Sequence, residues 1–249
     1  HGQGAKTGAA YASMGLGSGI VADSKAADEW RECLAKGEFV TAASETFDLL
    51  ETLAFDPVEG LIRLDRHLAR MAQSAEQFGF RFNRHDARNR LQAATFRARL
   101  PSKVRIRLGR SGAMAVEVTA FAQQSADVMR VAVAPAPLMT GDFRVRHKTS
   151  LRGVYDQCRK ESGAVEVVFV DAAGFVTEGS YTNIFVERGG VLLTPPLEKA
   201  LLAGVLRAEL LETGQASESP LRIEDLEHGF FIGNSLRGLI PAELTRELV

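Results

Sequence analysis

The stretches RHKTS at residues 146–150 and TEGSYTNIF at residues 177–185 decide the fold. In the first stretch, Lys148 stands between an expected extended segment and an expected helix. In the second, Glu178 ends one apolar strand, and a glycine-serine turn leads into the next strand. Most lysine and glutamate side chains are solvated surface charges, and each of these two residues, taken alone, fits that interpretation. The alternative is a Schiff-base lysine with a carboxylate partner for a pyridinium ring, because the residue types are those that this chemistry needs.

Two further motifs follow these stretches in a fixed order, LAGVLR at residues 202–207 and GNS at residues 233–235. Together with HKT at residues 147–149, this order resembles the fold type IV family of pyridoxal-phosphate enzymes. The resemblance covers roughly residues 46–244. It implies an α+β fold of two mixed sheet-and-helix domains. The family contains branched-chain and D-amino-acid aminotransferases and 4-amino-4-deoxychorismate lyase.

The resemblance also implies a set of site residues around pyridoxal 5'-phosphate. Lys148 is expected to form the Schiff base, and Glu178 to face the pyridine nitrogen. The expected phosphate ligands are Arg70, the backbone amides of Val205 and Leu206, Asn234 and Ser235. Without the resemblance, Arg70 is an ordinary solvated helix arginine, and the 204–207 segment is an ordinary helix start.

Candidate substrate ligands lie on two expected strands. Arg105 and Arg107 alternate with apolar residues, so both point to one face of a strand and could bind substrate carboxylates. A solvent-facing polar strand gives the same alternation, and this alternative stays open. Thr52 matches a strand that lines the family's substrate pocket, where its hydroxyl could take part in proton transfer. Arg144 and Arg146 would share a face with Lys148 if that segment is extended.

Composition bounds the class of protein. The 249 residues are 45% apolar with a net charge of −1, which suits a sizeable core and gives no basic surface for nucleic acid. No apolar run approaches the length of a membrane span. Cys33 and Cys158 are far apart without a CxxC spacing, and the histidines show no metal-ligand spacing. These features favour a reducing cytoplasm and no metal.

The expected domain organisation has four parts. Residues 1–37 form a leader that resembles the tail of chorismate-utilising synthases, or alternatively a flexible glycine-rich extension. An N-terminal α/β domain is expected at residues 38–137, a linker at 138–146, and a cofactor-binding domain at 147–249. Within these, the apolar spacing predicts a helix from about residue 64 to Phe78 that ends at Gly79, and a strand near residues 221–223.

The favoured function is that of 4-amino-4-deoxychorismate lyase, which releases 4-aminobenzoate and pyruvate in folate biosynthesis. The leader favours it, because it resembles the end of the synthase that makes the substrate, as in a fusion of consecutive enzymes. Residues 47–53, 66–70 and 233–238 also look more like the lyase branch. A branched-chain or D-amino-acid aminotransferase, and a non-catalytic domain of a fused synthase, remain the alternatives. The family suggests a homodimer.

Overall fold

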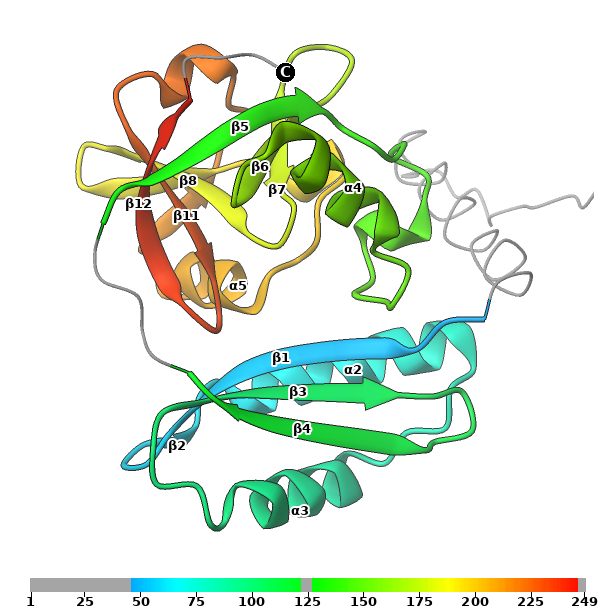
Figure 1. Ribbon diagram of the computed structural model, residues 1–249. Helices are drawn as coiled ribbons and strands as arrows, with labels where there is room; N and C mark the ends of the chain where they lie inside the picture. Colours follow the sequence, from blue (N-terminus) through cyan, green and yellow to red (C-terminus); the bar gives the residue numbers. More distant parts are fainter. Residues whose placement is uncertain (1–45, 122–126, 246–249) are drawn as a thin grey trace, which may run out of the picture.

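A computed structural model describes residues 46–121 and 127–245. The leader expected at residues 1–37, with its resemblance to a synthase tail, lies outside the described residues. The described chain forms two sheets, one above the other, each with its own helices (Figure 1).

The smaller sheet is antiparallel and has the strand order β2-β1-β3-β4. Its elements in chain order are β1 (Leu49–Asp56), β2 (Gly60–Leu61), the helices α2 (Leu64–Phe78) and α3 (Arg84–Thr95), β3 (Ser102–Leu108) and β4 (Met114–Ala120). Both helices lie between the two hairpins of this sheet in the sequence. They cover one of its faces, and Figure 1 shows the sheet from the other, uncovered side.

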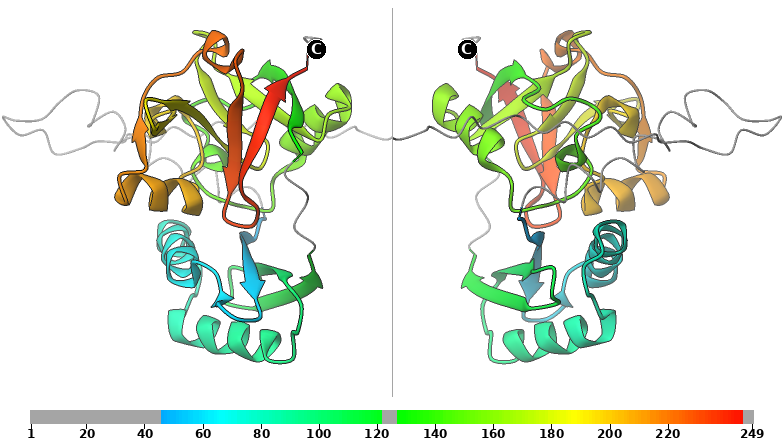
Figure 2. Two further views of the ribbon diagram at one scale, coloured as in Figure 1. Left: turned by 90° about the vertical axis from the view of Figure 1, so that its left-hand side faces the viewer. Right: turned by 90° about the vertical axis from the view of Figure 1, so that its right-hand side faces the viewer.

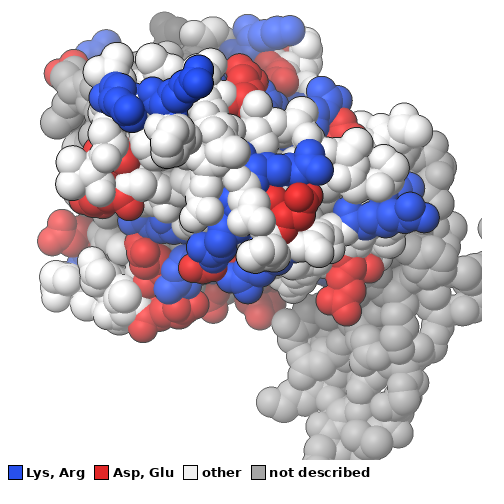
Figure 3. All heavy atoms as spheres, turned by 90° about the horizontal axis from the view of Figure 1, so that it is seen from below, with Lys and Arg blue, Asp and Glu red and all other residues white. Residues whose placement is uncertain are grey.

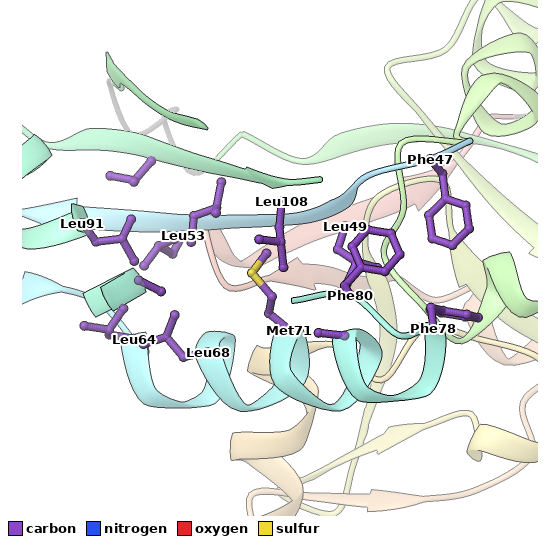
Figure 4. Close-up of a cluster of buried hydrophobic side chains, with 14 of the residues drawn as sticks. Phe47, Leu49, Leu53, Leu64, Leu68, Met71, Phe78, Phe80, Leu91 and Leu108 are labelled. Carbon is purple, nitrogen blue, oxygen red and sulfur yellow. The ribbon is translucent and has the colours of Figure 1, made fainter. Parts of the chain in front are cut away.

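The two faces of the smaller sheet differ because side chains alternate along each strand. In β3, Val104, Ile106 and Leu108 are fully buried, while Arg105 and Arg107 are exposed on the opposite face. Figure 4 shows the buried side chains of β1 and β3 packed against those of α2. The alternation expected from the sequence is therefore confirmed, and the arginine face is the one that does not pack on the helices.

Helix α2 ends where the sequence predicts. Its apolar side chains at helical spacing, including Leu68 and Met71, face the small core. Gly79 follows in the left-handed conformation with φ 67°, and its N–H donates to the carbonyls of Ala75 and Glu76. A residue without a Cβ is favoured at this position, because side chains clash in that conformation.

The larger sheet has eight strands in the order β10-β9-β8-β11-β12-β5-β6-β7 and is strongly curved (Figure 1). Its strands are β5 (Met129–Pro135), β6 (Glu166–Val170), β7 (Val176–Gly179), β8 (Asn183–Arg188), β9 (Val191–Thr194), β10 (Ala216–Glu218), β11 (Phe230–Asn234) and β12 (Gly238–Leu244). Its helices are α4 (Gly153–Ser162) and α5 (Val205–Glu212), with 3-10 turns η1 (Phe143–Val145), η2 (Leu197–Lys199) and η3 (Ile223–Leu226).

Strand β5 corrects the expected boundary between the domains. It pairs in parallel with β6 and β12 of the larger sheet, so the chain changes sheets between β4 and β5 and not at residues 138–146. Pro135, Pro137 and Gly141 suggested a linker directly after β5 and so placed this strand in the N-terminal domain, but the strands that complete its hydrogen bonds come later in the chain. The segment at 138–146 contains the turn η1 and runs beside the larger domain.

Two local expectations also differ from the structure. The segment before Lys148 is not extended, because η1 curls it and Asp142 holds the Arg144 side chain and backbone N–H. Near residues 221–223, where a strand was expected, there is one isolated bridge, between Phe175 and Arg222, followed by η3.

Strand β12 was not anticipated. It contains Pro241, which lies before the part of β12 that pairs with β5, so its missing N–H costs no ladder bond there.

Helices α2 and α5 join the two layers. Figure 2 shows α5 directly above α2 in both views. Arg63 contacts Glu209 at 2.5 Å and Arg66 contacts Glu212 at 2.6 Å, so two ion pairs cross between the helices. Seen from below, acidic and basic side chains are intermixed on the face that Figure 3 shows. Among the described helices, none has the length and apolar character to cross a bilayer.

Gly79→Ala should destabilise the protein by about 1 kcal/mol, because alanine is strained in the left-handed conformation that Gly79 adopts. The strain is local to the backbone of this residue, since an added Cβ there would meet no neighbouring residue. The measurement is the free energy of unfolding in urea. Gly153→Ala is the matched control, because its added Cβ also meets nothing and its φ is not positive. Equal stabilities of the two variants would contradict the assigned role of Gly79.

Candidate active site

A cavity of about 760 Å³ lies between the exposed face of the smaller sheet and the larger domain. Both layers contribute to its walls. Of the site residues expected from the sequence, it is lined by Thr52, Arg70, Arg105, Arg107, Lys148, Glu178, Val205, Asn234 and Ser235. Leu206 does not line it: its side chain is 4% exposed and packs with Phe185 and Leu210. Only the backbone of Leu206, in the first turn of α5, can face the cavity.

Backbone pairing with β1 positions Lys148. The Lys148 carbonyl accepts the Leu50 N–H at 2.8 Å, and Thr149 bridges Leu49 in an antiparallel sense. Desolvation lowers the pKa of the Lys148 ammonium to about 7, and the nearby guanidinium of Arg70 acts in the same direction. Lys148 is therefore an amine that loses its proton near neutral pH, as a Schiff-base or general-base lysine must.

Glu178 lies near the C-terminal end of β7 and is 6% exposed. Its carboxylate accepts the Tyr155 hydroxyl at 3.1 Å and the Leu202 N–H at 2.9 Å. Burial raises the pKa of Glu178 to about 7, although these two donors favour the charged form. A carboxyl group held here by two fixed donors can accept a proton from a group that enters the cavity, or share a proton with it.

A buried carboxylate connects Arg70 to the opposite wall. Glu51, 1% exposed, accepts both Nε and Nη2 of Arg70 at 2.7 Å and Nδ1 of His67 at 2.7 Å. Burial would raise the pKa of Glu51, but Arg70 and His67 hold it well below its usual range. Burial lowers the pKa of His67, which favours the neutral ring. Nε2 of this ring then accepts the Ser235 hydroxyl, with 2.7 Å between the two atoms.

Arg70 keeps donors for an anion. Its Nη1 donates to the Ala203 carbonyl at 3.0 Å, and its other two bonds go to Glu51. A guanidinium has more N–H groups than these three bonds use. The Ala203 carbonyl precedes α5, and the guanidinium therefore lies at the start of that helix. The placement agrees with the expected anion contact, while the pairing with Glu51 was not foreseen.

The N-terminus of α5 has no side-chain cap from the described residues. A Cβ on Gly204 would overlap Oδ1 of Asn183, so only glycine permits this close approach of the helix start to β8. Gly204 and Val205 line the cavity, and uncapped helix N–H groups bind phosphate well. With Arg70 and Ser235, this end of the cavity has the donor set that a phosphate needs.

Asn234 lines the cavity and also shapes the turn after β11. Its Oδ1 accepts the N–H groups of Leu236 and Arg237 at 3.1 and 3.0 Å, and its Nδ2 donates to the Tyr181 carbonyl at 3.2 Å. These bonds give Asn234 a positioning role in the turn, and the expected contact of its side chain with an anion stays a prediction. The signal was present in the sequence, because asparagine commonly closes such turns.

The two strand arginines differ in their partners. Arg107 forms an ion pair with Asp48. Arg105 stands opposite Thr52 in the β1–β3 register and has no ion pair with any residue that the structure describes. The sequence correctly placed both arginines on one face of the strand. Arg105 has Glu117 of β4 as its other cross-strand neighbour but forms no ion pair in the described chain.

Sequence reasoning missed three polar residues of the site: Glu51, Tyr155 and Glu166. Glu51 lies between Leu49 and Leu53 on the same buried face of β1, which was a signal for a paired internal carboxylate. Glu166 is fully buried and accepts the Ser180 N–H at 2.7 Å and the Thr182 hydroxyl at 2.9 Å. It holds the turn that follows Glu178, and nothing in its local sequence indicates this.

Comparison with known proteins gives consistent matches. A family model described as amino-transferase class IV matches residues 48–244. A Schizosaccharomyces pombe protein named "Putative aminodeoxychorismate lyase" is 27% identical over 195 residues, which cover 74% of this chain and 83% of that protein.

Two solved structures share the fold. A "Putative amino-acid aminotransferase" from Mesorhizobium loti is 39% identical, with a TM-score of 0.75 over 80% of this chain and 100% of that chain. The pyridoxal-phosphate-bound form of "A hypothetical aminotransferase from Mycobacterium tuberculosis" is 22% identical, with a TM-score of 0.70 over 82% of this chain and 83% of that chain. The two-domain α+β architecture expected from the sequence is thus the fold of these neighbours.

Glu51→Gln should destabilise the protein by about 3 kcal/mol, because it leaves the largely desolvated Arg70 guanidinium, with its side chain 13% exposed, without its counter-charge. Urea unfolding at neutral pH measures this. Glu76→Gln, at an exposed position of α2, is the control.

The ion pair between Glu51 and Arg70 can also be tested through the pH dependence of stability. The pKa of Glu51 is lowered in the folded state, so its contribution is present above the unfolded pKa of about 4.3 and is lost progressively as the pH falls below that value. The acid-induced loss of stability should be smaller in Glu51→Gln than in the wild type. Parallel pH profiles of the two proteins would refute the pairing.

Proposed function

The chain belongs to the amino-transferase class IV family, whose cofactor is pyridoxal phosphate, and from this premise we propose that it is a lyase. The proposed reaction converts 4-amino-4-deoxychorismate to 4-aminobenzoate and pyruvate, a step of folate biosynthesis. One observation carries the proposal: Arg105 lines the cavity that holds Lys148 and has no ion pair within the described chain. The proposed substrate carries two carboxylates and needs such cations.

The residues of the cavity fit the cofactor. The uncapped start of α5, the spare donors of Arg70 and the Ser235 hydroxyl would hold the phosphate. Glu178, opposite in charge to a pyridinium, would hold the ring nitrogen. Lys148 would supply the amine that binds the cofactor aldehyde. When bound, pyridoxal phosphate withdraws electrons from the carbon that bears the substrate amine.

Lys148 is proposed as the base. Its pKa of about 7 leaves a substantial fraction of the amine neutral at physiological pH, and a neutral amine can take the proton from the amine-bearing ring carbon. Glu178 would stabilise the positive charge of the protonated pyridine. Because Tyr155 and the Leu202 N–H fix its two oxygens, this carboxylate needs no rearrangement to do so.

Thr52 is proposed as the proton donor to the leaving group. It lines the cavity from β1, next to the strand pairing that carries Lys148. In the proposed reaction the carbon–oxygen bond to the enolpyruvyl group breaks, the ring becomes aromatic, and the released oxygen takes a proton. Lys148, protonated in the preceding step, is the alternative donor.

An amino-acid aminotransferase is the second candidate. The 39% identity to the Mesorhizobium loti protein of that name favours it, and that chain is matched over its whole length. The name of the fission yeast relative favours the lyase. The two reactions differ in one respect that can be measured, because a transaminase needs a 2-oxo acid as second substrate and the lyase does not. A non-catalytic domain of a fused synthase would need no cofactor. A protein that stays colourless after incubation with pyridoxal phosphate would favour this third alternative.

Lys148→Ala should fold normally but retain no borohydride-fixed pyridoxyl group. In the cofactor-free wild type, acetylation of Lys148 should rise with a half-point near pH 7, because below this pH the amine is protonated and unreactive. Borohydride reduction followed by peptide mapping measures the fixed pyridoxyl group. Competitive labelling with acetic anhydride measures the acetylation of Lys148. The other lysines serve as internal controls. A pyridoxyl group trapped on Lys103, Lys160 or Lys199 would remove Lys148 from this role.

Incubation of the cofactor-loaded protein with 4-amino-4-deoxychorismate should give equal amounts of 4-aminobenzoate and pyruvate without any 2-oxo acid. Chromatography measures the first product and a lactate dehydrogenase assay the second. A parallel tube contains branched-chain or D-amino acids with 2-oxoglutarate. Glutamate in that tube, with no product in the first, would replace the lyase by an aminotransferase.

A further inference from the structure

A second cation faces the cavity from the larger domain. Arg237 lies in the turn between β11 and β12, and its backbone N–H is held by Asn234 at 3.0 Å. Its guanidinium carbon lies 5.7 Å from the centre of the Tyr181 ring and 5.3 Å from that of Phe121, which follows β4 of the smaller sheet. Arg237 therefore reaches from one layer to the other across the edge of the cavity.

The Tyr181 ring is itself fixed. Its hydroxyl donates to the Val165 carbonyl at 3.2 Å, and its backbone carbonyl accepts from Asn234 at 3.2 Å. Two aromatic contacts orient the planar guanidinium without using any of its N–H donors. The orientation of Arg237 is thus set while its hydrogen-bonding capacity remains.

Other arginines of the cavity are committed within the protein. Arg107 pairs with Asp48, Arg159 with Asp156, and Arg152 donates to the Ser180 carbonyl. In contrast, Arg237 has no ion pair among the residues that the structure describes. Its Nε is buried and has no hydrogen-bond partner within the same part of the chain.

The two terminal nitrogens of Arg237 are not among the buried unpartnered atoms and form no hydrogen bond with the described residues, so they are the donors that a ligand carboxylate in the cavity can reach. Guanidinium groups bind carboxylates through two parallel N–H···O bonds, which these two nitrogens can supply. The phosphate donors identified above, at the start of α5, do not include Arg237. The cavity therefore has a phosphate end and, separately, two cations with free charge, Arg105 on the smaller sheet and Arg237 on the larger domain.

We infer that Arg237 determines substrate specificity: it binds one carboxylate of the substrate while Arg105 binds the other, so the site selects amines that carry two carboxylates. This inference rests on the proposed function and replaces Arg107 by Arg237 as the second carboxylate ligand. Arg107 already has an acidic partner, whereas Arg237 has an unused donor.

The test uses the cofactor-loaded protein and two probes, benzoate and isophthalate, which differ by one carboxylate. Calorimetry measures both dissociation constants. The wild type should bind isophthalate more tightly, and Arg237→Met should weaken isophthalate binding by about tenfold or more while changing benzoate binding less. Arg237→Lys keeps the charge and should lose only part of the preference, which separates a carboxylate contact from a folding defect.

Arg222→Met is the matched control. Arg222 also stacks on an aromatic ring, with its guanidinium carbon 4.1 Å from the centre of Phe175, but it lies outside the cavity lining. Arg222→Met should leave the dissociation constants of benzoate and isophthalate unchanged. Cofactor absorbance should be equal in all variants.

Three results would overturn the inference while leaving the proposed function intact. They are a wild type without preference for isophthalate, an Arg237→Met variant that keeps the preference, and an Arg237→Met variant that loses the cofactor instead. A wild type that cannot be loaded with pyridoxal phosphate would overturn the proposed function itself.

Discussion

The buried Glu51 carboxylate is the interaction on which the site depends. It binds Arg70 and His67 of α2 from its place on β1, and through them it reaches the Ala203 carbonyl and the Ser235 hydroxyl of the larger domain. A charge removed from water needs complete pairing, since an uncompensated one costs several kcal/mol. The requirement to satisfy Glu51 therefore fixes the relative positions of four segments that line one end of the cavity.

The cavity itself follows from the two-sided smaller sheet. One face is covered by α2 and α3 and supplies the core, so the side chains that alternate with the core residues point to the other face and can be polar. That face carries Arg105 and Thr52 as cross-strand neighbours. The backbone of residues 148–150 pairs with the start of β1, and this brings the lysine of the larger domain to the edge of the same face.

Desolvation moves the pKa values of the two central groups toward each other. It lowers the pKa of Lys148 and raises that of Glu178, and both reach about 7. Groups with such values can hold or release a proton near neutral pH, which is the condition for acid–base work. The same loss of water leaves Arg70 and Arg237 as strong ligands for anions, because charge-assisted hydrogen bonds gain strength where water is excluded.

The sequence by itself determined the helix that ends at Gly79, the alternation of β3, and the order of motifs that indicated the α+β fold and a Lys148–Glu178 pair. Each depends on local spacing, and local spacing is set by backbone geometry. Only the tertiary structure decided that β5 belongs to the larger sheet, that Asn234 serves its own turn, and that Arg107 is paired while Arg105 and Arg237 have no ion pair in the described chain. These outcomes depend on which distant residues meet, and the physical reason is that burial and pairing, not residue type, decide whether a charge is available to a ligand.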